Sequence, residues 1–284
     1  MRYLVGEHNN STSVFLVNGE GAVNLTVLSP DIGTDLMSLI NKPGTLPLLT
    51  DEIAKAPQVA VSKIVPALPI ERPGKVICLG LNYVDHVKEG GYEIPTYPAL
   101  FMRGLNSLMP AGAPMVRPAV SEKLDYEAEL MLIIGTGGRH IKEEDAYNHV
   151  FGYTLFNDGS VRDYQRKTHQ WTPGKNFDNT GAIGPIVVTP DELPDGCAGL
   201  KIESRIGDEV MQSASTSEMM WPVAKTIATL SEFATLESGD MIAMGTPPGV
   251  GNARNPPRFL QPGEVISVEI EGIGICSNPI KDEK

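Results

Sequence analysis

The segment from Leu124 to Gly135, LDYEAELMLIIG, has the alternating pattern of a strand that carries two carboxylates on one face. Successive side chains of a β-strand point to opposite faces, so Glu127 and Glu129 share a face and lie roughly 6.5–7 Å apart. The opposite face is apolar and should pack against a core through Tyr126, Ala128, Leu130, Leu132 and Ile134.

Two neighbouring carboxylates among apolar residues repel each other and lose solvation, so Glu127 and Glu129 require compensation. A divalent cation with oxygen ligands provides it. A solvated strand face or a pair of salt bridges is the alternative, and the segment by itself leaves both interpretations open.

The chain has 284 residues, of which 41% are hydrophobic and 20% charged, a composition typical of a globular protein. Its net charge of −12 argues against nucleic acid or an anionic membrane as the main partner. No apolar run approaches the ~18–20 residues that a membrane-spanning helix needs.

The cysteines, Cys78, Cys197 and Cys276, are odd in number and widely separated in apolar surroundings. This pattern indicates reduced, buried thiols rather than a disulfide framework. The N-terminal residues turn polar too early to form a signal peptide. We therefore expect a cytoplasmic protein.

Glycine and proline are frequent, with 29 and 23 residues, which predicts many turns between short strands. We expect residues 1–70 to form a small N-terminal β subdomain and a linker, and residues 71–284 to form the main domain. In the first part, strands are expected at Tyr3–Val5, Ser13–Val17 and Ala22–Val27, and short helices at Thr34–Ile40 and Asp51–Ala54. The many short strands favour a β-rich barrel or sandwich.

Polar residues suited to chemistry recur further along the chain. His86 and Glu89 would be i and i+3 neighbours on a helix, where the carboxylate can orient the imidazole as a water-activating base. Asp158 lies where a strand becomes a turn, and Lys175 lies in a polar loop from which it could stabilise an oxyanion. Taken singly, these residues are also compatible with an incidental surface pair, a helix N-cap and a solvated lysine, and these alternatives stay open.

Several familiar motifs are absent from the sequence. The chain has no His-x-Asp/Glu or HExxH, no GxGxxG or P-loop, and no GxSxG. The remaining groups are acidic oxygen ligands, one His–Glu pair, a lysine and the Gly/Thr-rich loop 245–251. They suit Mg²⁺ or Mn²⁺ with an oxygen-rich substrate such as a 2-oxo acid.

The signatures ExE, NDxSxRDxQ and GTPxGVG occur together in one chain. They lie within the segments LGLNYVDHVKE (79–89), PALFMR (98–103), DYEAELMLIIG (125–135), FNDGSVRDYQ (156–165), GKNFD (174–178), LESGDMIAMGTPPGVG (236–251) and GEVISVEIEGIG (263–274). This order resembles the fumarylacetoacetate hydrolase superfamily over about residues 75–274. The resemblance implies a β-rich α+β fold with a mixed β-sandwich or β-roll catalytic domain, usually in a homodimer.

The resemblance also implies roles for individual residues. Glu127, Glu129 and Asp158 match the carboxylates that hold a divalent metal. His86 and Glu89 match a pair that activates water, and Lys175 matches a lysine near the metal and the substrate carbonyl. Contacts to substrate are implied for Tyr83, Arg103, Arg162, Gln165 and Thr246. Many relatives carry lysine at the position of Arg103, which leaves its part in substrate choice open.

The activity implied by the resemblance is metal-dependent hydrolysis of a β-diketo acid of the acylpyruvate type to pyruvate and a carboxylic acid. The nearest alternative is decarboxylation of oxaloacetate, or isomerisation and decarboxylation of a diene-dioate, on the same metal site. A metal-binding protein without catalysis is a further alternative. In each case the partner is a small 2-oxo or β-diketo acid.

Overall fold

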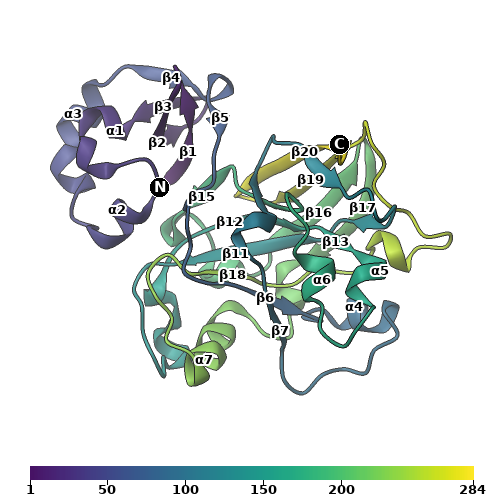
Figure 1. Ribbon diagram of the computed structural model, residues 1–284. Helices are drawn as coiled ribbons and strands as arrows, with labels where there is room; N and C mark the ends of the chain where they lie inside the picture. The colour runs from purple at the N-terminus through teal and green to yellow at the C-terminus, as the bar shows by residue number, and fades with distance from the viewer.

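A thirteen-stranded sheet runs through the whole molecule in the computed structural model, which describes residues 1–284 (Figure 1). Its main path is β4 (Gln58–Ala60), β3 (Gly21–Asn24), β2 (Ser11–Asn18), β1 (Arg2–His8), β15 (Ile186–Val188), β12 (Val150–Asp158), β11 (Ala128–Ile134), β18 (Met241–Ala243), β6 (Val76–Gly80) and β7 (Ala99–Met102). Strands β5 (Val65–Pro66), β8 (Leu108–Pro110) and β14 (Gly181–Ile183) join this sheet beside the main path.

A second sheet closes the other side of the main domain. Its order is β17 (Glu209–Ser215), β16 (Lys201–Ile206), β19 (Val265–Ile270), β20 (Gly274–Asp282) and β9 (Met115–Arg117). A short pair joins β10 (Leu124–Asp125) to β13 (Ser160–Val161). The helices are α1 (Leu25–Leu28), α2 (Met37–Asn41), α3 (Thr50–Lys55), α4 (Val84–Glu89), α5 (Arg162–Gln165), α6 (Thr172–Lys175) and α7 (Val223–Phe233). This strand-rich α+β architecture confirms the predicted fold class.

The N-terminal residues form a separate lobe, drawn in purple in Figure 1. The predicted strand Ala22–Val27 was wrong in its second half, because β3 ends at Asn24 and Leu25–Leu28 forms α1. The side chain of Asn24 caps this helix by accepting a hydrogen bond from the N–H of Val27 (3.0 Å). The lobe shares the large sheet with the main domain, since β1 pairs with β15. The domain boundary near residue 70 stays a prediction.

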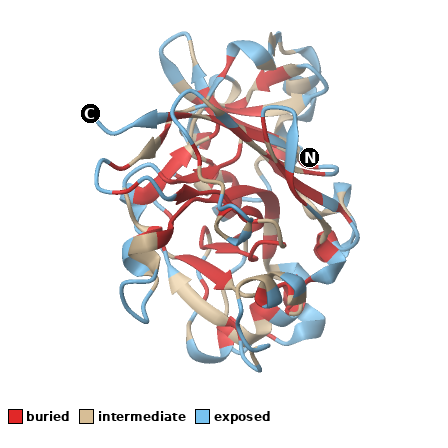
Figure 2. Cartoon of the chain, turned by 90° about the vertical axis from the view of Figure 1, so that its right-hand side faces the viewer, coloured by how far each residue is buried: buried red, intermediate tan, exposed pale blue.

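Strand β11 lies at the centre of the large sheet, between β12 and β18, and every one of its residues is buried. Figure 2 shows buried strands throughout the interior of the molecule. The predicted apolar face packs into the larger core, as its members Leu130 and Leu132 show. On the opposite face, Met131 and Ile133 pack into a second core to which the N-terminal lobe contributes. The alternation is therefore confirmed. The face that carries Glu127 and Glu129 continues along the strand with apolar side chains that pack into the second core.

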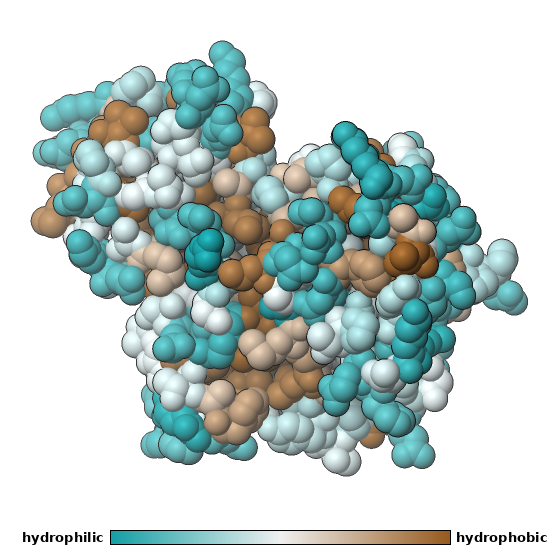
Figure 3. All heavy atoms as spheres, in the orientation of Figure 1, coloured by the Kyte–Doolittle hydropathy of each residue, from teal (hydrophilic) through white to brown (hydrophobic).

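The cysteines agree with the expectation from the sequence. All three cysteines are buried and free, and burial raises the pKa of the Cys276 thiol to about 12. No helix is both long and apolar enough to cross a membrane. Hydrophilic side chains cover most of the face seen in Figure 3, with apolar ones gathered between the N-terminal lobe and the rest of the chain.

Candidate active site

Glu127, Glu129 and Asp158 come together because β11 and β12 are antiparallel neighbours. Glu129 pairs with Phe156 in the register of these strands, and the N–H of Asp158 donates to the carbonyl of Glu127 (3.0 Å). The carboxylates are buried, and one oxygen from each lies within 4.8 Å of the others. The structure thus assembles the predicted triad.

The carboxylates of the triad have different electrostatic surroundings. Burial raises the pKa of Glu127, but Lys175 and Arg162 outweigh it and lower the pKa to about 2. Burial and the neighbouring charges of Asp158 and Glu127 hold the pKa of Glu129 well above its usual range. The carboxylate of Glu129 accepts a hydrogen bond from the N–H of Gly245 (3.0 Å) and has no cationic side chain as partner.

This donor set fits a divalent cation. Three buried carboxylates within reach of one another supply hard oxygen ligands, and Glu129 has no protein cation to balance its charge. Glu127, Glu129 and Asp158 are the residues that would hold the ion. Lys175 and the arginines around the triad offset part of the remaining negative charge.

Lys175 ends α6, a short helix where the sequence predicted a loop. The helix packs closely on α5, because a Cβ atom on Gly174 would lie only 2.4 Å from the backbone nitrogen of Gln165. Lys175 Nζ thereby lies 2.6 Å from both Glu127 Oε2 and Asp158 Oδ2. Burial lowers the pKa of Lys175, but these carboxylates outweigh it and raise the pKa, so the ammonium stays charged.

His86 and Glu89 lie on α4, as the sequence predicts, with His86 Nδ1 2.7 Å from Glu89 Oε1. The other oxygen of Glu89 accepts a hydrogen bond from the N–H of Gly249 (2.8 Å). Both side chains line the same cavity as Glu127 and Glu129. Because Nδ1 is engaged by Glu89, Nε2 is the ring atom free to exchange a proton in this cavity.

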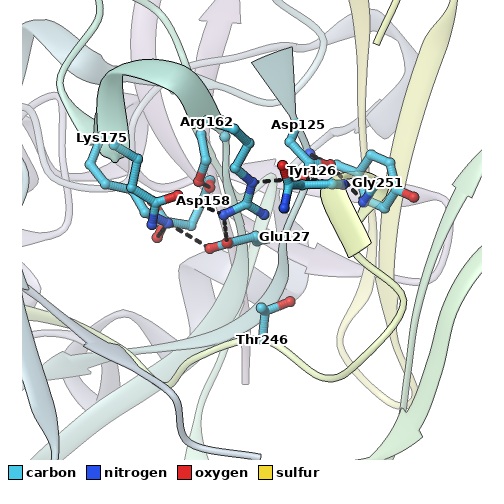
Figure 4. A network of polar contacts seen from close by, with 12 residues as sticks. Asp125, Tyr126, Glu127, Asp158, Arg162, Lys175, Thr246 and Gly251 are labelled. Carbon is cyan, nitrogen blue, oxygen red and sulfur yellow. Dashed lines mark hydrogen bonds and ion pairs between the residues drawn. The ribbon is translucent and has the colours of Figure 1, made fainter. Parts of the chain in front are cut away.

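Three of the predicted substrate contacts, Arg162, Gln165 and Thr246, line this cavity. Arg162 lies between Asp125 and Glu127, at 2.7 and 2.8 Å, and Figure 4 shows it above the carboxylate of Glu127. Thr246 faces the site from the loop after β18, where its hydroxyl accepts a hydrogen bond from Gln212 (2.7 Å).

The other two predicted substrate contacts do not line the cavity. Arg103 is fully buried behind Asp158, where it forms an ion pair with that carboxylate and donates to the carbonyl of Gly159 (3.1 Å) and the hydroxyl of Thr180 (2.7 Å). Tyr83 is 1% exposed and belongs to the larger core, and its hydroxyl has no partner. Arg103 therefore positions a triad carboxylate, and Tyr83 packs the core.

Asp125 is a residue that the sequence analysis did not assign to the site. Its buried carboxylate accepts hydrogen bonds from the N–H groups of Gly251 and Asn252 (2.8 and 2.9 Å) and pairs with Arg162 (Figure 4). The same alternation that joins Glu127 and Glu129 would have placed Asp125 on their face. Gln212, which fixes Thr246 and also accepts from the N–H of Ala128 (3.0 Å), has no comparable signal in the sequence.

Comparison with known proteins agrees with this geometry. Residues 75–281 match the family model described as fumarylacetoacetate (FAA) hydrolase C-terminal. The match covers well over half of the chain and includes every residue of the candidate site. The protein belongs to the FAA hydrolase family.

The similarity to individual proteins extends over nearly the whole chain. It is 38% identical to the human protein named oxaloacetate tautomerase FAHD2A, mitochondrial, over 98% of this chain and 88% of the relative. The structure of a putative HpcE protein from Mycobacterium smegmatis aligns over 100% of both chains, with a TM-score of 0.88 and 32% identity. Maleylpyruvate hydrolase from Sphingobium sp. SYK-6, solved with manganese(II) and pyruvate, aligns over 100% of both chains with a TM-score of 0.83 and 25% identity.

Proposed function

We propose that this protein is a divalent-metal-dependent enzyme that interconverts the keto and enol forms of a short 2-oxo dicarboxylic acid, with oxaloacetate as its substrate. The observation that carries the proposal is a single cavity lined by Glu127, Glu129 and Lys175 together with the His86–Glu89 pair, with the buried Asp158 completing the triad. The relative named oxaloacetate tautomerase supports the choice of substrate, since it is similar to this chain over nearly its whole length.

The triad and Lys175 would activate the substrate carbonyl. A divalent cation held by Glu127, Glu129 and Asp158 would act as a Lewis acid toward the 2-oxo group, as either Mg²⁺ or Mn²⁺ could. The manganese(II) and pyruvate in the solved maleylpyruvate hydrolase support this assignment. Lys175 Nζ, a charged donor in a buried setting, would stabilise negative charge as it develops on the carbonyl oxygen.

His86 would move the proton. Its Nε2 accepts the proton that leaves carbon 3 of the keto acid, while the electron pair of that C–H bond forms the double bond between carbons 2 and 3. The charge then lies on the former carbonyl oxygen, and transfer of the proton from Nε2 to this oxygen gives the enol and restores the neutral imidazole. Glu89, held by the N–H of Gly249, keeps the imidazole oriented and stabilises its protonated form.

Hydrolysis of an acylpyruvate is the second candidate, and it is the activity that the sequence resemblance implies. The same His86–Glu89 pair can take a proton from water instead of from carbon. The 25% identical maleylpyruvate hydrolase supports this candidate. A homodimer and a cytoplasmic location remain predictions from the sequence.

An assay that follows two signals separates these activities. Enol oxaloacetate, maleylpyruvate and acetylpyruvate would each be incubated with Mg²⁺, with Mn²⁺ or with excess EDTA, while enol absorbance and pyruvate release are recorded. We expect metal-dependent loss of the oxaloacetate enol without pyruvate release. Pyruvate from a diketo acid would establish the hydrolase instead, and pyruvate from oxaloacetate would establish a decarboxylase.

The control variants for this assay are Asp158→Asn in the triad and Glu232→Gln on the exposed surface of α7. The first should abolish the metal-dependent signal, and the second should leave it unchanged. Metal binding without turnover of any of these acids would refute the proposal.

A further inference from the structure

One helical turn lines the cavity with three polar side chains, Arg162, Gln165 and Arg166. Arg162 is buried next to Glu127, and Gln165 accepts a hydrogen bond from Arg162 Nη1 (2.9 Å). Arg166 continues the turn, with its N–H donating to the carbonyl of Arg162 (3.2 Å), and its side chain is exposed. The turn therefore leads from the buried triad toward solvent.

Arg166 differs from the other cations of the cavity because it has no protein partner. Lys175 is paired with Glu127 and Asp158, and Arg162 is paired with Asp125 and Glu127. No carboxylate lies within 4.0 Å of the Arg166 guanidinium, and no hydrogen bond holds it. Its positive charge is available to a molecule in the cavity.

A second unused donor lies deeper on the same turn. Arg162 Nη2 is buried and has no hydrogen-bond partner, although Nε and Nη1 of the same guanidinium are both engaged. A buried N–H group without a partner is costly, so a bound acceptor at this point would be favourable. Part of the remaining cavity wall is aromatic, formed by Tyr92, Phe101 and Trp171, and offers no competing charge.

We propose that Arg166, assisted by Arg162 Nη2, binds the second carboxylate of the substrate and makes the site selective for dicarboxylic 2-oxo acids. This inference rests on the proposed function only in placing the 2-oxo end of the substrate at the triad. It holds equally for proton transfer and for C–C hydrolysis. A guanidinium suits the task because its fork matches a carboxylate in a bidentate arrangement.

The test compares two acids of equal chain length that differ at the far end. Oxaloacetate carries a carboxylate where 2-oxobutanoate carries a methyl group. Their dissociation constants would be measured by calorimetry on the Mn²⁺-loaded protein for wild type, Arg166→Gln, Arg166→Lys and Arg72→Gln. The last variant removes an exposed arginine outside the cavity and controls for net charge.

We expect wild type to bind oxaloacetate more tightly than 2-oxobutanoate. Arg166→Gln should bind oxaloacetate about tenfold more weakly, the loss expected for one charge-assisted hydrogen bond, and should bind 2-oxobutanoate as wild type does. Arg166→Lys should retain part of the preference, and Arg72→Gln all of it. Equal binding of both acids by wild type, or an equal loss for both in Arg166→Gln, would overturn the inference. If wild type bound Mn²⁺ but neither of the two acids, the proposed function itself would be refuted, and the inference with it.

Discussion

At the floor of the cavity, Glu127 and Asp158 are each held by two cations, whereas at its rim His86 depends on a single carboxylate. Lys175 bridges the floor carboxylates, with Arg162 and Arg103 completing their ion pairs. The rim consists of α4, whose His86 and Glu89 side chains are 14% and 20% exposed, and of the exposed Arg166.

This difference separates two tasks. The floor must hold like charges close together out of water, which requires many fixed partners. In the function proposed above, the rim exchanges a proton and admits a substrate, and its groups keep contact with solvent. We expect substitutions in the floor to affect metal binding and stability, and those in the rim to affect turnover and substrate choice.

The largest effect is expected from the triad itself. Asp158→Asn and Glu129→Gln each remove a charged ligand, so Mn²⁺ binding measured by calorimetry and all turnover should be lost. Glu232→Gln, on the exposed face of α7, should behave as wild type. Wild-type turnover in either triad variant would show that the carboxylates do not form the working site.

Lys175→Met should separate stability from catalysis. Without metal, the variant leaves Glu127 and Asp158 without one buried cation, and the free energy of unfolding should fall by about 3–5 kcal/mol in chemical denaturation. Saturating Mn²⁺ should restore much of this stability, because it binds only the folded chain. Turnover should stay low with metal bound. Full turnover would exclude a role for Lys175 in stabilising the oxyanion.

His86→Gln tests whether the histidine at the rim transfers the proton. Loss of a general base typically lowers turnover by about 10²–10⁴-fold, and we expect this loss with Mn²⁺ affinity and unfolding temperature unchanged. His8→Gln, which alters a histidine on β1 in the N-terminal lobe, is the matched control. Equal turnover in His86→Gln and wild type would assign proton transfer to another group.

The smallest effect is expected from substitution of Arg103. It distinguishes a role of this residue in metal binding from a role in substrate binding. Because its guanidinium contacts Asp158, Gly159 and Thr180 rather than the cavity, Arg103→Met should weaken Mn²⁺ binding by about 10–100-fold and leave the KM of the metal-saturated enzyme unchanged. Arg103→Lys should recover part of the loss, since one ammonium replaces only part of the fork. A raised KM with normal metal affinity would restore Arg103 to substrate binding.

Local patterns in the sequence were sufficient to place side chains whose neighbours in the site lie close to them along the chain. Alternation placed Glu127 and Glu129 on one face, helical spacing paired His86 with Glu89, and a strand end presented Asp158. The N-cap interpretation of Asp158 was wrong, because the residue that precedes α5 is Val161.

Local patterns carry no information where the position of a side chain depends on how distant segments pack. The sequence could not tell whether Arg103 points into the cavity or behind Asp158, since this depends on where the residue after β7 lies relative to Asp158 at the end of β12. For the same reason it missed the contacts of Asp125 with the backbone of Gly251 and Asn252.

The sequence by itself determined the β-rich class, the shared face of Glu127 and Glu129 and the His86–Glu89 pair, because these follow from periods of two and of three to four residues along the chain. The third carboxylate, Asp158, was assigned through the family resemblance. Only the tertiary structure decided which groups share the cavity. It joined the lobe to the main sheet, buried Arg103 and Tyr83 away from the cavity, and left Arg166 without a protein partner. Such outcomes depend on strand register and helix packing between distant segments, which no local pattern encodes.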